Sequence, residues 1–140
     1  MDTGMDTVQA ARRWARTWEQ AWREHDAPAI AALYRRDAQY RSSPFRDPEE
    51  GGALGYVMRA FAGESGVVCR FGPPMVDGRR AAVEWWAALD EDGAGRTLAG
   101  TTVLTFDEDG LAVDHVDYWR HAEQRMPPYP GWAAGAGTLF

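Results

Sequence analysis

The sequence contains no lysine and only one cysteine among its 140 residues. A single cysteine excludes an internal disulfide, and with no signal-peptide pattern at the N-terminus we expect a cytoplasmic protein. Cys69 stands among apolar residues of an expected strand, which favours a buried thiol over a nucleophile. No apolar run approaches the roughly 18 residues that a membrane span requires, so we expect no membrane association.

Basic residues are also in the minority, because 15 arginines face 21 acidic residues and the net charge is −6. A chain without a basic stripe is not expected to bind nucleic acid. The length and the 45% hydrophobic share predict one soluble domain spanning residues 1–140. No histidine, cysteine or acidic set has metal-ligand spacing, and no glycine pattern is typical of phosphate binding, so we expect neither a metal nor a cofactor.

The first half of the chain has helical spacing. We expect a flexible tail over residues 1–5 and an amphipathic helix over residues 6–24. Asp26-Ala-Pro predicts a second short helix that reaches Tyr34, and a short strand follows over residues 38–42. Asp47 and Pro48 have the pattern of a cap and a first helical residue, which predicts a third helix ending near Gly63.

The second half reads as an antiparallel meander. We expect strands over residues 67–76 (bent at Pro73-Pro74), 81–89, 98–106 and 112–121, then an extended tail over residues 122–140 that Tyr129 and Trp132 anchor. Three helices followed by such strands predict an α+β cone. In this cone a curved, mostly antiparallel sheet packs on the three N-terminal helices and encloses a pocket.

The most informative segment is residues 110–121, in which polar and aromatic residues alternate. Side chains of a strand alternate between its faces, so Val113, His115, Asp117 and Trp119 share one face. This pattern favours the wall of a polar-lined cavity over an edge strand with two solvated faces. Asp117 is the leading acid–base residue and His115 its partner. The alternative is that Asp117 only accepts a tryptophan N–H or pairs with an arginine.

Seven tryptophans are spread over distant segments. Trp14 and Trp18 lie on one helical stripe, which forms either the core or a wall for a planar ligand. Trp85 and Trp86 must point to opposite faces of their strand, and an outer tryptophan is typical of an interface. We therefore expect a homodimer through the sheet, which sedimentation at micromolar protein concentration tests.

Several segments in this order resemble the nuclear transport factor 2-like superfamily, and within it the SnoaL-like proteins. The resemblance covers about residues 8–132. It is carried by the tryptophan-bearing first helix, by Glu24-His25-Asp26 leading to Ala32-Leu33-Tyr34, by Ser42-Ser43-Pro44-Phe45, and by Asp117-Tyr118-Trp119. It implies the cone fold but no single activity, because the superfamily contains isomerases, cyclases, dehydratases, epoxide hydrolases and non-catalytic members.

Known activities of the superfamily carry over only in part. The aspartate base of the ketosteroid isomerases falls at Ser43. Their oxyanion-hole tyrosine and aspartate fall near Trp18 and near Thr102, so none of the three positions has the required side chain. The SnoaL-type cyclase base falls near Arg120, and Asp117 is the nearest carboxylate. Asp117 with an arginine would imitate part of the Asp-Arg-Asp set of the epoxide hydrolases. The resemblance also implies that an aromatic late in the last strand lines the pocket. This turns Asp117 and His115 inward, together with Leu98, Gly100, Thr102, Leu104 and Phe106 of the preceding strand.

Two functions remain open at this point. One is an acid–base enzyme of isomerase, cyclase, dehydratase or epoxide hydrolase type that acts on a largely apolar or aromatic metabolite. The other is a non-catalytic ligand-binding or dimerisation module. In both, the expected ligand-binding residues are Trp14, Trp18, Tyr40, Ser42, Phe45, Thr102 and Trp119, and Asp117 with His115 supplies any catalysis.

Overall fold

The computed structural model describes residues 6–134, so the tail expected over residues 1–5 and the last six residues lie outside the described part. Three helices come first: α1 (Thr7–Glu24), α2 (Ala27–Ala31) and α3 (Gly52–Phe61). The carboxylate of Asp6 caps α1 by accepting from Gln9 N, and Asp26 caps α2 in the same way through Ala29 N. The seven buried residues of α1 are alanines and tryptophans, so the helix presents an apolar stripe to the sheet.

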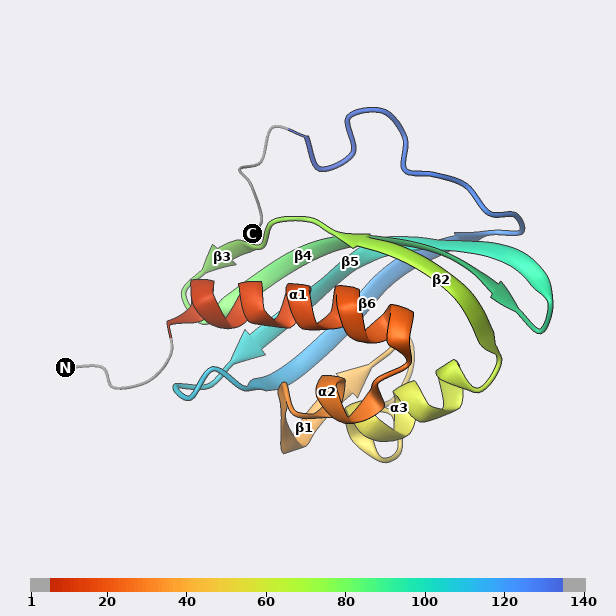
Figure 1. Cartoon of the computed structure of the whole chain (residues 1–140). Helices are drawn as coiled ribbons and strands as arrows, with labels where there is room; N and C mark the ends of the chain where they lie inside the picture. The colour runs from red at the N-terminus through yellow and green to blue at the C-terminus, as the bar shows by residue number, and fades with distance from the viewer. Residues whose placement is uncertain (1–5, 135–140) are drawn as a thin grey trace.

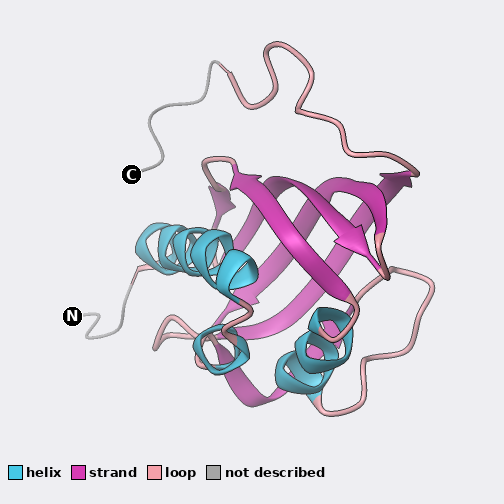
Figure 2. Cartoon of the chain, turned by 45° about the vertical axis from the view of Figure 1, so that its right-hand side comes forward, coloured by secondary structure: helices cyan, strands magenta, loops and turns pink. Residues whose placement is uncertain are grey.

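The sheet has six strands, which curve around the helices (Figure 1). They are β1 (Tyr34–Arg41), β2 (Glu64–Phe71), β3 (Met75–Asp77), β4 (Arg80–Glu91), β5 (Ala94–Phe106) and β6 (Ala112–Ala122). The order is β1-β6-β5-β4-β2, with β3 beside β4, and every pairing except the parallel β1–β6 pair is antiparallel. All three helices lie on the concave face (Figure 2). The expected α+β cone is confirmed.

The second helix is shorter than predicted. It ends at Ala31, and Tyr34 opens β1 instead of closing the helix. The apolar spacing of Ile30, Leu33 and Tyr34 fits a helix equally well, but Ala112 N donates to Leu33 O, and Tyr34 pairs with Ala112 in β6. A pairing between residues so distant in sequence leaves no trace in local periodicity.

The third helix begins later than predicted, at Gly52 rather than near Pro48. Gly51 and Gly52 have φ angles of 79° and 63°, a left-handed conformation that interrupts a helix. The segment before them returns to the end of β1, where Glu49 N donates to Tyr40 O at 2.7 Å. The helix start predicted from Asp47 and Pro48 is therefore wrong.

Two strand boundaries differ as well. The strand expected over residues 67–76 is two strands, because Gly72, Pro73 and Pro74 separate β2 from β3. The strands expected over residues 81–89 and 98–106 extend toward each other and meet at a tight turn, so that β4 and β5 pair from Arg80↔Thr105 to Glu91↔Ala94. This long hairpin brings Glu91 and Arg96 to the same end of the sheet.

Four residues of β6 were predicted to share one face, and three of them do. His115 and Asp117 are buried and Trp119 packs on the core, all on the concave side. Val113 is the exception, because a bulge shifts the β5–β6 register so that Thr105 pairs with Asp114 and Phe106 with Ala112. Ala112 is consequently the buried residue at this point.

Trp86 lies on the outer face of the sheet, and Trp85 on the concave face. The segment that follows β6 runs along the outer side (Figure 1). There Trp86 donates to Met126 O at 2.9 Å and contacts the rings of Tyr129 and Trp132 edge-on. The chain itself thus covers the tryptophan from which we predicted a sheet-mediated homodimer, and the dimer stays a prediction. The extended segment begins after Ala122. Of its two expected anchors, Trp132 is buried, whereas Tyr129 is exposed.

The core fills the space between α1 and the sheet with tryptophan, alanine and branched aliphatic side chains. Cys69 belongs to it, donating to Glu19 O, and burial raises the pKa of its thiol to about 12, as an inert buried cysteine requires. Among residues 6–134, no helix combines the length and the apolar character that crossing a membrane demands.

Candidate functional site

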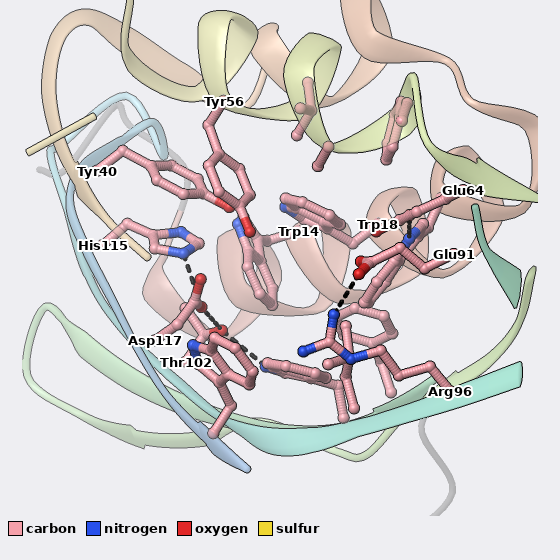
Figure 3. Close-up of a pocket in the computed structure, with 18 of the residues that line it drawn as sticks. Trp14, Trp18, Tyr40, Tyr56, Glu64, Glu91, Arg96, Thr102, His115 and Asp117 are labelled. Atoms are coloured by element: carbon pink, nitrogen blue, oxygen red, sulfur yellow. Dashed lines mark hydrogen bonds and ion pairs between the residues drawn. The ribbon is translucent and has the colours of Figure 1, made fainter. Parts of the chain in front are cut away.

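A cavity of about 270 Å³ opens between the helices and the concave face of the sheet (Figure 3). Its walls are mainly aromatic. The polar groups gather at two ends, with Asp117, His115 and Thr102 at one end and Glu64, Glu91 and Arg96 at the other. An apolar wall with a few converging polar groups is typical of a small-molecule site. The wall residues include Trp14, Trp18, Trp22, Tyr40, Tyr56, Phe71, Trp85, Leu98 and Trp119.

Asp117 Oδ1 is the point at which the hydrogen bonds of the first end converge. It lies 2.8 Å from His115 Nε2 and accepts from Thr102 Oγ1 at 2.6 Å. Thr102 Oγ1 in turn accepts from Trp85 Nε1 at 2.9 Å, so its own proton is directed to Asp117. The interpretation of Asp117 as a residue held only by tryptophan or arginine is therefore wrong, since its partners are a histidine and a threonine.

Tyr34 sets the direction of the other branch. Its hydroxyl oxygen accepts from Trp14 Nε1 at 2.9 Å and from Trp18 Nε1 at 3.1 Å, which occupies both lone pairs. The Tyr34 proton must then donate to His115 Nδ1, 2.9 Å away. With Nδ1 as an acceptor, a neutral His115 carries its proton on Nε2 and donates it to Asp117. The hydrogen bonds donated by Tyr34, His115 and Thr102 thus all run in the direction of Asp117 Oδ1.

The second oxygen, Asp117 Oδ2, accepts no hydrogen bond from residues 6–134 and faces the cavity. Two tyrosine hydroxyls without a partner in the described chain face the same space, those of Tyr40 and Tyr56 (Figure 3). The Tyr40 ring stacks on His115 at 3.8 Å and on Tyr56 at 4.9 Å between centroids. Burial raises the pKa of both tyrosines above the ordinary value, and the charge of Asp117 raises it further. Both hydroxyls therefore remain protonated donors.

Trp119 closes the cavity beside Asp117. It pairs with Gly100, where an added Cβ would meet Tyr118 O at 2.2 Å and Trp119 Cβ at 2.7 Å, so the glycine gives the tryptophan its space. The Trp119 indole donates to Ser42 O at 2.6 Å. Ser42 thus supports the wall through its backbone, and its hydroxyl, which bonds Glu49, does not line the cavity.

Phe45 is a correction to the predicted site, because its side chain is 97% exposed and lies outside the cavity. It lies in a tight turn after β1, in which Phe45 N donates to Ser43 Oγ. The other predicted residues Trp14, Trp18, Tyr40, Thr102, His115, Asp117 and Trp119 all line the cavity.

The other polar end was missed from the sequence. Arg96 Nη1 forms an ion pair with Glu91 Oε1, and Glu64 Oε1 accepts from Trp22 Nε1 at 2.8 Å. Burial raises the pKa of Glu64, and the nearby charge of Glu91 adds to this, whereas the Trp22 hydrogen bond and Arg96 oppose it. These residues stand at strand ends, where charge is common, so their pattern gave no signal for a site.

A carboxyl whose pKa is raised by folding makes stability depend on pH. Glu64 favours the folded state while it is protonated, and this contribution is lost as the pH rises above the ordinary value of 4.5 and through the folded-state pKa. The amide oxygen of Glu64→Gln can still accept from Trp22. The melting temperature of this variant minus that of wild type should therefore increase as the pH rises from 4 to 8. Thermal melts across this range test it, with the exposed Glu108→Gln as control. A Glu64→Gln difference that stays constant with pH contradicts the expectation.

The remaining histidines lie away from the cavity. His25 ends α1 in a left-handed conformation and stacks on Phe61, and His121 is exposed beside Glu123. Across residues 6–134, no three histidine, cysteine or acidic side chains are arranged to hold a metal ion.

Comparisons with known proteins agree with this architecture. A family model described as a SnoaL-like domain matches residues 14–115. No curated protein matches the sequence. Among solved structures, an LEH-like epoxide hydrolase of Mycobacterium tuberculosis is similar with a TM-score of 0.66 at 18% identity, covering 82% of this chain and 86% of that one. The pinacolase BvnE of Penicillium brevicompactum gives 0.65 at 19% identity, covering 81% and 84%.

A third similar structure is SalBIII, described as an epoxide hydrolase/cyclase-like enzyme in pyran ring formation in the polyether salinomycin. Its TM-score is 0.67 at 18% identity, covering 82% of this chain and 95% of that one. At such identities the likeness establishes the fold.

Proposed function

The chain belongs to the SnoaL-like family, and from this premise we propose that it is an acid–base enzyme that moves a proton on a small, largely apolar carbonyl compound. The observation that carries the proposal is the asymmetry of Asp117. Oδ1 receives both hydrogen bonds, and Oδ2 is left open to the cavity. A carboxylate fixed through one oxygen and free at the other is suited to accept a substrate proton.

The proposed step balances within the cavity. Asp117 Oδ2 takes a proton from the carbon next to the carbonyl group. The electron pair of that C–H bond forms a C=C bond, and the carbonyl π pair moves to oxygen. Tyr40 and Tyr56 donate hydrogen bonds to the oxygen on which the negative charge develops. The proton then returns from Oδ2 to a carbon or to the oxygen, which regenerates Asp117.

His115 acts as a positioning residue in this proposal. Its Nε2–H bond to Oδ1 keeps the carboxylate oriented, and Tyr34 holds the imidazole ring in turn. The epoxide hydrolase alternative is supported less well. It requires an arginine beside Asp117, whereas the hydrogen-bond partners of this carboxylate in the described chain are Thr102 and His115. Arg46 also lines the cavity, but it pairs with Glu49. The similar structures are described as an epoxide hydrolase, a pinacolase and an epoxide hydrolase/cyclase-like enzyme, which is compatible with acid–base chemistry here.

The experiment is deuterium exchange of 2-tetralone, a two-ring ketone with acidic protons beside its carbonyl group. In D₂O buffer, wild-type protein should speed the loss of these proton signals in ¹H NMR spectra by at least about 100-fold over Asp117→Asn at equal concentration. The variant is a matched control because it keeps the shape of the side chain. Binding of 2-tetralone to wild type with exchange no faster than in the variant rejects the proposal and leaves the non-catalytic binding module.

A further inference from the structure

Arg96 is the most unusual group at the second polar end of the cavity. Its Nη1 bonds Glu91, but its Nε is buried without a hydrogen-bond partner, and Nη2 has none in the described chain. Nε and Nη2 form one edge of the guanidinium, a fork of parallel donors. Nε is enclosed by the protein, so the donor that a ligand can reach is Nη2. An unpaired guanidinium N–H in a cavity wall points to an acceptor that arrives with a ligand.

Glu64 supplies the complementary group. Its Oε1 accepts from Trp22 Nε1, and Oε2 has no partner among residues 6–134. Figure 3 shows Glu64, Glu91 and Arg96 gathered at one side of the cavity, across from Asp117 and Thr102, with Trp14 and Trp18 between. The cavity thus offers an unpartnered donor, Arg96 Nη2, and an unpartnered acceptor, Glu64 Oε2, at the end remote from Asp117.

The charges decide which ligand group fits there. Two carboxylates accompany one guanidinium, so a negatively charged ligand group meets repulsion from Glu64 and Glu91. A hydroxyl group matches the open atoms, because its oxygen accepts from Arg96 and its proton is donated to Glu64 Oε2. A ketone oxygen satisfies only Arg96 and leaves the acceptor of Glu64 unused.

We propose that Arg96 and Glu64 form a specificity subsite for a neutral hydroxyl group of the substrate, at the opposite end of the cavity from Asp117. This deepens the proposed function, on which it rests only for the identity of the reacting end. The substrate class is then an apolar, ring-containing molecule with an enolisable carbonyl group near Asp117 and a hydroxyl group at its far end. The aromatic wall holds the rings between the two ends.

The test compares three naphthalene probes by isothermal titration calorimetry: 2-naphthol, 2,6-dihydroxynaphthalene and 6-hydroxy-2-naphthoate. The symmetric diol gains about twofold over 2-naphthol by statistics alone. With a hydrogen bond to a charged group added, wild type should bind the diol about tenfold more tightly than 2-naphthol. The naphthoate should bind no more tightly than 2-naphthol.

Two variants locate the effect. Arg96→Lys keeps the charge opposite Glu91 but removes the Nη2 donor, and Arg96→Met removes both the charge and the donor. In each, the diol advantage over 2-naphthol should fall to the statistical factor of about twofold. Thermal melts confirm that the variants are folded, and the lysine variant serves if the methionine variant is not.

Any of four results overturns the subsite: equal binding of diol and mono-ol by wild type, an advantage that survives in Arg96→Lys, tighter binding of the naphthoate, or no binding of either naphthol. Asp117→Asn should keep the diol advantage, because Asp117 is not part of the subsite. A wild type that shows the diol advantage but no tetralone exchange would therefore reject the proposed function and retain the subsite.

Discussion

Tyr34→Phe is expected to lower the free energy of unfolding by about 2–5 kcal/mol. The hydroxyl of Tyr34 accepts from two buried indoles and donates to His115, which is 1% exposed. Removing it leaves two donors and one acceptor without their partner, and each such group costs about 1–3 kcal/mol when buried. Water that enters from the cavity can bond some of these groups, so the expected loss of stability is smaller than the sum of the three separate costs. Urea denaturation of both proteins measures the difference.

Tyr56→Phe is the matched control for this prediction. It removes the same atom from the same ring type, but the Tyr56 hydroxyl has no hydrogen-bond partner in the described chain. Its stability should stay within about 1 kcal/mol of wild type. If the Tyr34 and Tyr56 variants lost equal stability, the Tyr34 hydroxyl would not be the junction of the network.

Asp117→Asn is expected to separate stability from activity. The amide oxygen of asparagine can take the place of Oδ1 and accept from His115 and Thr102, with the NH₂ group facing the cavity in place of Oδ2. Hydrogen bonds to a neutral oxygen are weaker, but the cost of burying a charge also disappears, so stability should change by less than about 1 kcal/mol. The proton acceptor is lost, and tetralone exchange should fall by at least about 100-fold.

Asp117→Leu shows the contrast, since leucine has a similar size but no acceptor. It leaves the donors of His115 and Thr102 without a partner and should cost about 1–3 kcal/mol for each. Paired melts of the asparagine and leucine variants give the comparison. An Asp117→Asn variant as unstable as Asp117→Leu, with exchange unchanged, would make Asp117 a structural residue.

Much of the first polar end could be predicted from the sequence, because alternation along one strand is a local signal. Asp117, His115 and Trp119 share the concave face of β6, and the register with β5 adds Thr102. The bulge near Val113 could not be predicted, since it depends on how two strands pair around a turn.

Tyr34 was missed for a different reason. Its apolar spacing fits a helix, and only the parallel pairing of β1 with β6 brings its hydroxyl to His115. Phe45 failed in the opposite sense, because an aromatic residue near a pocket segment was expected to face inward, and a tight turn directs it to solvent. Glu64 and Arg96 come together only through the long β4–β5 hairpin and the neighbouring β2.

The assignment of Asp117 Oδ2 as the reacting atom depends on the direction of the hydrogen bonds that reach Oδ1. The ¹⁵N chemical shifts of the His115 ring report that direction, in wild-type protein at pH 7.5 with the other two histidines replaced by glutamine. The predicted spectrum is that of a neutral imidazole protonated at Nε2, with Nδ1 an unprotonated acceptor from Tyr34. A neutral ring protonated at Nδ1 would contradict the account, because Oδ1 would then keep only the hydrogen bond from Thr102 and the assignment of Oδ2 as the reacting atom would lose its support.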